Sequence, residues 1–158
     1  MIRTLMIAAG LLALSSSALP SSAMAAEPYG RNVTLKEAKA VAAAAEAEAT
    51  KAGVAVTITV VEPNGAPVLV WKMDGASYSA PEVSRRKAET ATAYRRPTKA
   101  FQDAVKGGNL NAISNGALAI EGGELLMVDG RIVGAVGVAG ATPEQDGVLA
   151  RAGAAAVK

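Results

Sequence analysis

Two residues between apolar runs, Asp129-Gly130, constrain the fold of this chain more than any other feature of its sequence. The runs 124–128 and 131–138 flank them, and a two-residue Asp-Gly connection is typical of a tight β-hairpin turn. A second hairpin is predicted upstream, where the runs 56–61 and 68–73 flank a turn rich in proline, asparagine and glycine. The chain is therefore predicted to contain four strands in two antiparallel pairs.

Helix signals lie before the first hairpin and after the second. Residues 34–37 have the capping-box sequence, and alanine and valine then recur at helical spacing until Gly53, a residue typical of a helix end. A second capping box at 142–145 begins a terminal helix that runs toward Val157. Both helices present small apolar residues, so their partners are expected to approach closely.

Two further helices are predicted between the hairpins. Ser79 is expected to cap a helix over 80–94, which ends before the next proline because the residue preceding proline leaves the helical region. Thr98 is expected to cap a short helix over 99–105, and residues 109–123 are predicted to form a loop. The predicted fold class is α+β, in the order α-β-β-α-α-β-β-α, with a four- to five-stranded antiparallel sheet of two hairpins packed with helices.

The first 25 residues are predicted to be a secretory signal peptide. Arg3 supplies a positive start, residues 5–14 form an apolar run, and Ala23-Met24-Ala25 has the small-x-small pattern of a cleavage site. The run is too short to span a bilayer, which needs roughly 20 residues, although an N-terminal membrane anchor is the alternative interpretation. Residues 26–158 are then predicted to form one domain, periplasmic or secreted, with no membrane contact after cleavage.

The composition removes several classes of function. The chain has no cysteine and no histidine, which excludes disulfides, a Ser-His-Asp triad and metal sites built from thiolate or imidazole. Its 16 basic and 14 acidic residues nearly balance, and only 3% of the residues are aromatic, so no nucleic-acid partner is predicted. Chemistry in this protein therefore relies on carboxylates, amines, guanidinium groups, hydroxyls, methionine sulfur or the backbone.

Several segments taken together resemble the GlcG/HbpS family. These segments are 86–91, 96–98, 122–126, 128–140 and 142–146. The resemblance implies a small α+β sandwich that forms homo-oligomers, often octamers, and relatives that bind haem outside the cell or form the C-terminal half of some corrinoid adenosyltransferases. It therefore implies an exported protein that binds a small molecule, haem or a related tetrapyrrole. The alternatives are a small enzyme acting on an organic acid or lactone, and an accessory oligomeric protein.

The missing histidine bears directly on a haem site. Some members of the family are thought to hold haem iron through histidine, and this chain departs from that pattern. On chemistry alone the axial ligand candidates are Tyr78, Tyr94, Met73 and Met127. Each of them is equally a residue type that fills cores and interfaces, which is the alternative interpretation.

Four glycines are candidate ligand-binding positions. Gly122 and Gly123 precede a predicted strand, where they would either bring backbone N–H groups toward a carboxylate or form a turn with positive φ. Gly137 and Gly140 lie in or beside the following strand. A glycine there indicates close approach, either of a ligand or of a helix with an alanine face.

Charged residues supply the catalytic candidates. Glu121 and Lys87 are candidate bases, and Arg85 is a candidate ligand-binding residue that would clamp a carboxylate. Asp146 falls in the first turn of the last predicted helix. Its charge is interpreted as favourable at the helix N-terminus, with a general acid/base or a cross-subunit salt bridge as alternatives.

Overall fold

The computed structural model describes residues 27–158, so the signal peptide predicted over residues 1–25 lies outside the described residues. Helices and strands follow one another in the predicted order, with one short helix added. The elements are α1 (Leu35–Lys51), β1 (Thr57–Val61), β2 (Pro67–Lys72), α2 (Ala80–Tyr94), α3 (Thr98–Lys106), α4 (Asn111–Ser114), β3 (Gly123–Val128), β4 (Arg131–Ala139) and α5 (Pro143–Ala154).

The four strands form one antiparallel sheet in the order β2-β1-β4-β3. Each predicted hairpin is present, and the two hairpins join through β1 and β4, whose register runs from Thr57 opposite Ala139 to Val61 opposite Ala135. The two middle strands of the sheet, β1 and β4, therefore come from distant parts of the chain. The α+β prediction is therefore confirmed, with four strands.

The N-terminal segment extends this sheet on the side where β1 ends. The Gly30 N–H donates to the Ile132 carbonyl at 2.8 Å and the Val33 N–H donates to the Val133 carbonyl at 2.7 Å. The only bridge of strand type here, in the described part of the chain, is a parallel one between Tyr29 and Ile132. A fifth full strand is therefore not formed, although the segment occupies its place.

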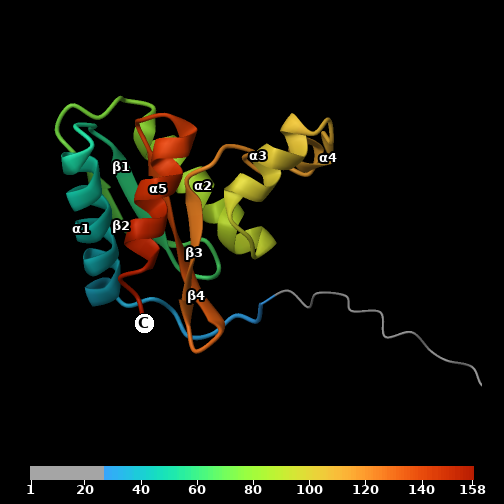
Figure 1. The fold of residues 1–158 in the computed structure, drawn as a ribbon. Coiled ribbons are helices and arrows are strands. Elements are labelled where there is room, and N and C mark those ends of the chain that lie inside the picture. Colours follow the sequence, from blue (N-terminus) through green and yellow to red (C-terminus); the bar gives the residue numbers. More distant parts are fainter. Residues whose placement is uncertain (1–26) are drawn as a thin grey trace, which may run out of the picture.

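Helices cover both faces of the sheet. Helices α1 and α5 lie together on one face, while α2 lies across the other and α3 and α4 project away from the sheet (Figure 1). The larger core cluster joins α1, α5 and the sheet, and a smaller one joins α2 to β1 and β4 through Val61, Ala88, Ala91 and Ala135. Within residues 27–158, no helix has both the length and the apolar character to cross a membrane.

Helix α2 lies directly on the strand backbone at two glycines. Gly123 and Gly137 face each other across β3 and β4. A Cβ at Gly137 would overlap the carbonyl oxygen of Ser84 and lie 2.7 Å from the amide nitrogen of Ala88, and a Cβ at Gly123 would overlap the Lys87 carbonyl. Helix α2 is therefore the partner that makes both strand glycines necessary. For Gly137 a close helix was one of the two predicted alternatives, whereas for Gly123 the sequence had indicated a carboxylate contact or a turn.

Local details differ from the sequence-based expectations at three places. Ser79 precedes α2 but its side chain makes no capping hydrogen bond, because its own backbone is already helical. Thr98 is the first residue of α3 rather than its cap, and its hydroxyl accepts the Gly123 N–H at 2.8 Å. The predicted loop over 109–123 contains the single turn of α4.

Gly137 gives a direct test of the close helix contact. Gly137→Val is expected to lower the free energy of unfolding by about 3 kcal/mol, since the clash is with helix backbone and no side chain can move aside. The measurement is urea unfolding followed by circular dichroism. Gly107→Ala is the matched control, because Gly107 has φ −81° and space for a Cβ, and is expected to change stability by less than about 0.5 kcal/mol. Equal effects would contradict the packing argument.

Candidate functional site

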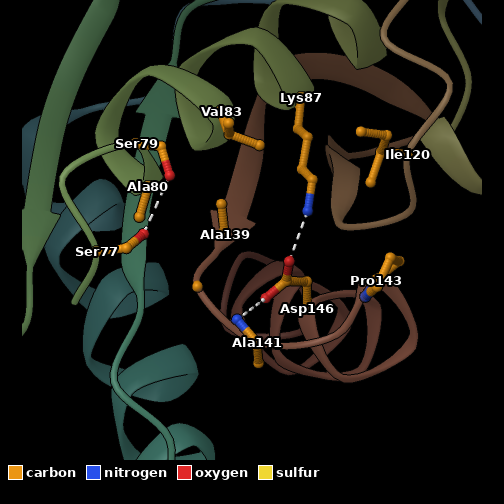
Figure 2. Close-up of a pocket in the computed structure, with 11 residues that line it drawn as sticks. Ser77, Ser79, Ala80, Val83, Lys87, Ile120, Ala139, Ala141, Pro143 and Asp146 are labelled. Atoms are coloured by element: carbon orange, nitrogen blue, oxygen red, sulfur yellow. Dashed lines mark hydrogen bonds and ion pairs between the residues drawn. The ribbon is translucent and has the colours of Figure 1, made fainter.

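A buried ion pair connects the two helical layers through the sheet. Lys87 of α2 is 1% exposed and Asp146 of α5 is 3% exposed. The Lys87 ammonium donates to Asp146 Oδ2 at 2.7 Å and to the Val138 carbonyl at 2.9 Å (Figure 2). Asp146 lies in the first turn of α5, as the sequence predicted, and it also has a partner within the chain.

Glycines and a helix N-terminus place the two charges together. A Cβ at Gly122 would lie 2.8 Å from both Lys87 Nζ and Asp146 Cβ, and φ at Gly122 is +122°. Asp146 lies in the first turn of α5, whose capping box begins at Thr142, and its Oδ1 accepts the Ala141 N–H at 3.1 Å. The Asp146 carboxylate is thus held by the backbone of its own loop as well as by Lys87.

Burial acts on both partners in favour of their uncharged forms. It lowers the pKa of Lys87, which the hydrogen bond to Asp146 partly opposes. It raises the pKa of Asp146, which the hydrogen bond from Lys87 partly opposes. With the lysine pKa moving down and the aspartate pKa moving up, transfer of a proton between the two groups costs less than it would between the same groups in water.

A pocket of about 230 Å³ opens beside this pair. It lies between the start of α2, the end of β4 and the first turn of α5, and Figure 2 shows the Lys87 side chain pointing down into it. Two of the three N–H groups of the ammonium are donated to Asp146 and Val138, and the third has no hydrogen-bond partner within residues 27–158. The lining residues are Ser77, Ser79, Ala80, Val83, Lys87, Ile120, Ala139, Gly140, Ala141, Pro143 and Asp146.

A second, more apolar surface lies on the other side of Ile120. Two adjoining hollows of about 320 and 180 Å³ share Arg86 and Gly116, and together they are called the α4 groove here. The side chain of Arg86 is exposed and makes no hydrogen bond or ion pair within residues 27–158. The apolar side chains of the groove are Val105, Ile113, Ala117, Leu118, Ala119 and Ile120.

Tyr94 forms part of the wall of the α4 groove. Its hydroxyl donates to the Asn115 carbonyl, and its ring meets Phe101 edge to face with centroids 5.1 Å apart. The phenol is half-buried and lies at the end of α2, two turns beyond Arg86. The groove therefore combines apolar walls, a free guanidinium group and a phenol.

The other charged candidates do not line either hollow. Glu121 is buried and accepts a hydrogen bond from Arg151 at 2.9 Å, and its negative charge favours the charged form of Lys87. Arg85 pairs with Glu82 and Glu89 along the surface of α2. The structure thus does not bring Arg85 to Lys87, and their joint role as clamp and base stays a prediction.

The remaining candidates are distributed over the molecule. Gly140 lines the Lys87 pocket, while the Gly123 N–H is used by Thr98. Among the axial candidates other than Tyr94, Tyr78 is fully exposed, and Met73 and Met127 are half-buried, with Met73 against the main core. Within residues 27–158, no three carboxylates gather as a metal site would require.

Two residues of these hollows, Asp146 and Arg86, were not among the site residues predicted from the sequence. Lys87 and Asp146 are 59 positions apart, and no local pattern indicates that they meet. Arg86 was one of several basic residues on a single helix, and only its contacts distinguish it from Arg85. A usable signal was the glycine pair at 122–123, because two glycines before a strand indicate that something approaches closely.

The chain belongs to the HbpS-like family. The family model described as "Haem degrading protein HbpS-like" matches residues 33–155. This confirms the resemblance on which the sequence-based expectations of fold and family depended.

Individual relatives agree with this assignment. An uncharacterized 15.0 kDa protein of Citrobacter freundii is 38% identical over 123 residues, which are 75% of this chain and 87% of that protein. The crystal structure of a PduOC:heme complex is 26% identical with a TM-score of 0.73, covering 80% of this chain and 96% of the other. A double mutant of Streptomyces reticuli HbpS is 29% identical with a TM-score of 0.74, covering 96% and 99%.

The buried pair makes a testable contribution to stability. Lys87→Met leaves Asp146 buried without its partner and is expected to lower the free energy of unfolding by about 3–5 kcal/mol. The double change Lys87→Met with Asp146→Leu is expected to recover most of this loss, as measured by urea unfolding. Lys99→Met, which breaks an exposed pair with Asp103, is the matched control and should have little effect. Additive losses in the double variant would refute the coupling.

Proposed function

We propose that this protein is an exported haem-binding protein and that haem lies in the α4 groove. The proposal is supported by the family match over residues 33–155 and by the haem complex of PduOC, a relative with the same fold. The observation on this chain that carries it is the groove itself, in which apolar walls, an exposed Arg86 and the Tyr94 phenol lie together.

The dimensions and chemistry of the groove suit one face of a porphyrin. The larger hollow, about 320 Å³, falls in the range of roughly 300–1,000 Å³ common for ligand sites. Val105, Leu118 and Ile120 provide apolar contacts for the macrocycle. Arg86 has a free planar guanidinium that can bind a propionate through two parallel hydrogen bonds.

In this proposal Tyr94 would hold the haem iron through its phenol oxygen. A tyrosine phenolate is an established ligand of haem iron, and the chain offers no histidine or cysteine. The Tyr94 hydroxyl donates to the Asn115 carbonyl, and this hydrogen bond would have to break for the phenol oxygen to hold iron. When bound, haem supplies one-electron and oxygen chemistry, while Arg86 orients the group and the apolar walls exclude water from it.

Titration of the apoprotein with haemin tests this site. A saturable change in Soret absorbance is expected, and Tyr94→Phe should shift the position of that band by removing the ligand. Tyr78→Phe is the matched control, since Tyr78 is fully exposed and outside the groove, and it should leave the spectrum unchanged. An unsaturable titration would reject haem binding, while equal spectra for both variants would reject Tyr94 as ligand.

The propionate contact has its own matched pair of variants. Arg86→Gln is expected to weaken haemin binding by roughly tenfold, the loss of one charge-assisted hydrogen-bonding partner. Arg85→Gln removes the same charge one residue away, where the guanidinium is paired with Glu82 and Glu89, and should leave the affinity nearly unchanged. The comparison is made by fluorescence quenching of the single tryptophan, Trp71. Equal losses would indicate a general charge effect.

Export and assembly complete the proposal. Export is supported by the signal-peptide pattern of residues 1–25, and intact mass of the periplasmic protein should show a chain that begins after Ala25.

Assembly into homo-oligomers is supported by exposed apolar side chains on the projecting α3–α4 region, Leu110 and Ile113. Light scattering should give a mass several times that of one chain, and Leu110→Asp should reduce it.

A further inference from the structure

We propose that the pocket beside Lys87 binds a small uncharged aldehyde or ketone and that Lys87 forms a reversible Schiff base with it. This site is separate from the α4 groove, although Ile120 borders both hollows. The inference therefore does not depend on haem binding.

The charges of the pocket select an uncharged ligand. Lys87 and Asp146 are the only ionisable side chains among its lining residues, and they form an ion pair with no net charge. An anion placed there would gain little from the lysine and would meet the aspartate at close range. A carbonyl oxygen, in contrast, needs only the third N–H of the lysine as its donor.

The volume and walls of the pocket select a small ligand. At about 230 Å³ it falls below the usual range for drug-sized molecules. Ala80, Val83 and Ile120 provide apolar walls on the side of α2 and the loop before β3, and Ser77 and Ser79 supply exposed hydroxyls at the rim. A short carbonyl compound with an apolar or hydroxylated tail matches this lining.

The setting of Lys87 is that of a reactive amine. A lysine attacks a carbonyl only through its neutral form, and the burial of Lys87 favours that form by lowering its pKa. Asp146 Oδ2, 2.7 Å away, is close enough to take the proton that the ammonium must lose. The aspartate is itself held by the Ala141 N–H, so it remains in position when the proton moves.

The proposed reaction balances without any further reactant. Lys87 passes one proton to Asp146, and its nitrogen lone pair then forms a bond to the carbonyl carbon while the carbonyl oxygen takes that proton back. Asp146 next removes a second proton from nitrogen and delivers it to the hydroxyl, which leaves as water as the C=N bond forms. The lysine ends as a protonated Schiff base and Asp146 as a carboxylate, so the total charge is unchanged.

Reductive trapping on the unaltered protein tests the proposal. The mature protein is incubated with propanal and cyanoborohydride at neutral pH, and its lysines are mapped by mass spectrometry after cleavage at glutamate. Cleavage yields the peptide 83–89, in which Lys87 is the only lysine, so the site of a propyl adduct is unambiguous. Lys87 is expected to react at least roughly tenfold faster than the exposed Lys99.

Two comparisons separate this chemistry from a purely structural ion pair. Asp146→Asn is expected to slow labelling of Lys87 by roughly 100-fold, the contribution of a positioned proton carrier, with Lys99 unchanged and circular dichroism confirming the fold. Glyoxylate, an anionic aldehyde, should label Lys87 more slowly than propanal does. Labelling of Lys87 no faster than Lys99 would overturn the proposal, as would a preference for glyoxylate. Haemin titration is independent of either result.

Discussion

The close contact between α2 and the backbone of the central sheet determines how the rest of the molecule is built. Gly123 and Gly137 face each other on adjacent strands, and without side chains they let the helix backbone rest on the sheet. At this distance the Lys87 side chain reaches past β4 to Asp146 on the opposite layer. A helix standing further away would leave the lysine short of its partner, and the pocket beside the pair would have a different shape.

The pattern of alternation, turns and caps was sufficient to predict the order of elements and their approximate bounds. These are local properties, and the Asp129-Gly130 turn and the capping boxes at Thr34 and Thr142 determine them within a few residues. The pairing of β1 with β4 was not predicted, because it depends on contacts between distant segments. Prediction from local pattern also failed at Ser79. The sequence has the pattern of a helix cap there, but the backbone of Ser79 is helical and its side chain makes no capping hydrogen bond.

The candidate site was predicted less completely, for the same reason. Lys87 and Gly140 were identified as candidate site residues. Asp146, the partner of Lys87, was interpreted mainly as a favourable charge at a helix N-terminus, because nothing near it in sequence shows that it is buried. Arg85 and Arg86 are neighbours in sequence but have different surroundings. One step along an α-helix turns the side chain by about 100°. The Arg85 guanidinium therefore pairs with glutamates, while the Arg86 guanidinium borders the α4 groove. The roles proposed for these arginines therefore depend on the face of α2 that each occupies, which the composition of the helix does not reveal.

Two hollows of different character lie on this one small domain. The α4 groove is open and apolar, whereas the Lys87 pocket is small and has a paired charge at its wall. They are separated by the segment around Ile120, which leads directly into β3.

The N-terminal segment of the described chain is attached to both the sheet and helix α2. Tyr29 donates a hydrogen bond to the Thr92 carbonyl at 2.7 Å and carries the Arg95 guanidinium 4.4 Å above its ring, while the Pro28 carbonyl accepts from Ile132. Cleavage after Ala25 would leave only two residues ahead of Pro28. An aminopeptidase would then find almost no loose end to trim, since the next residues are already secured at both the sheet and the helix.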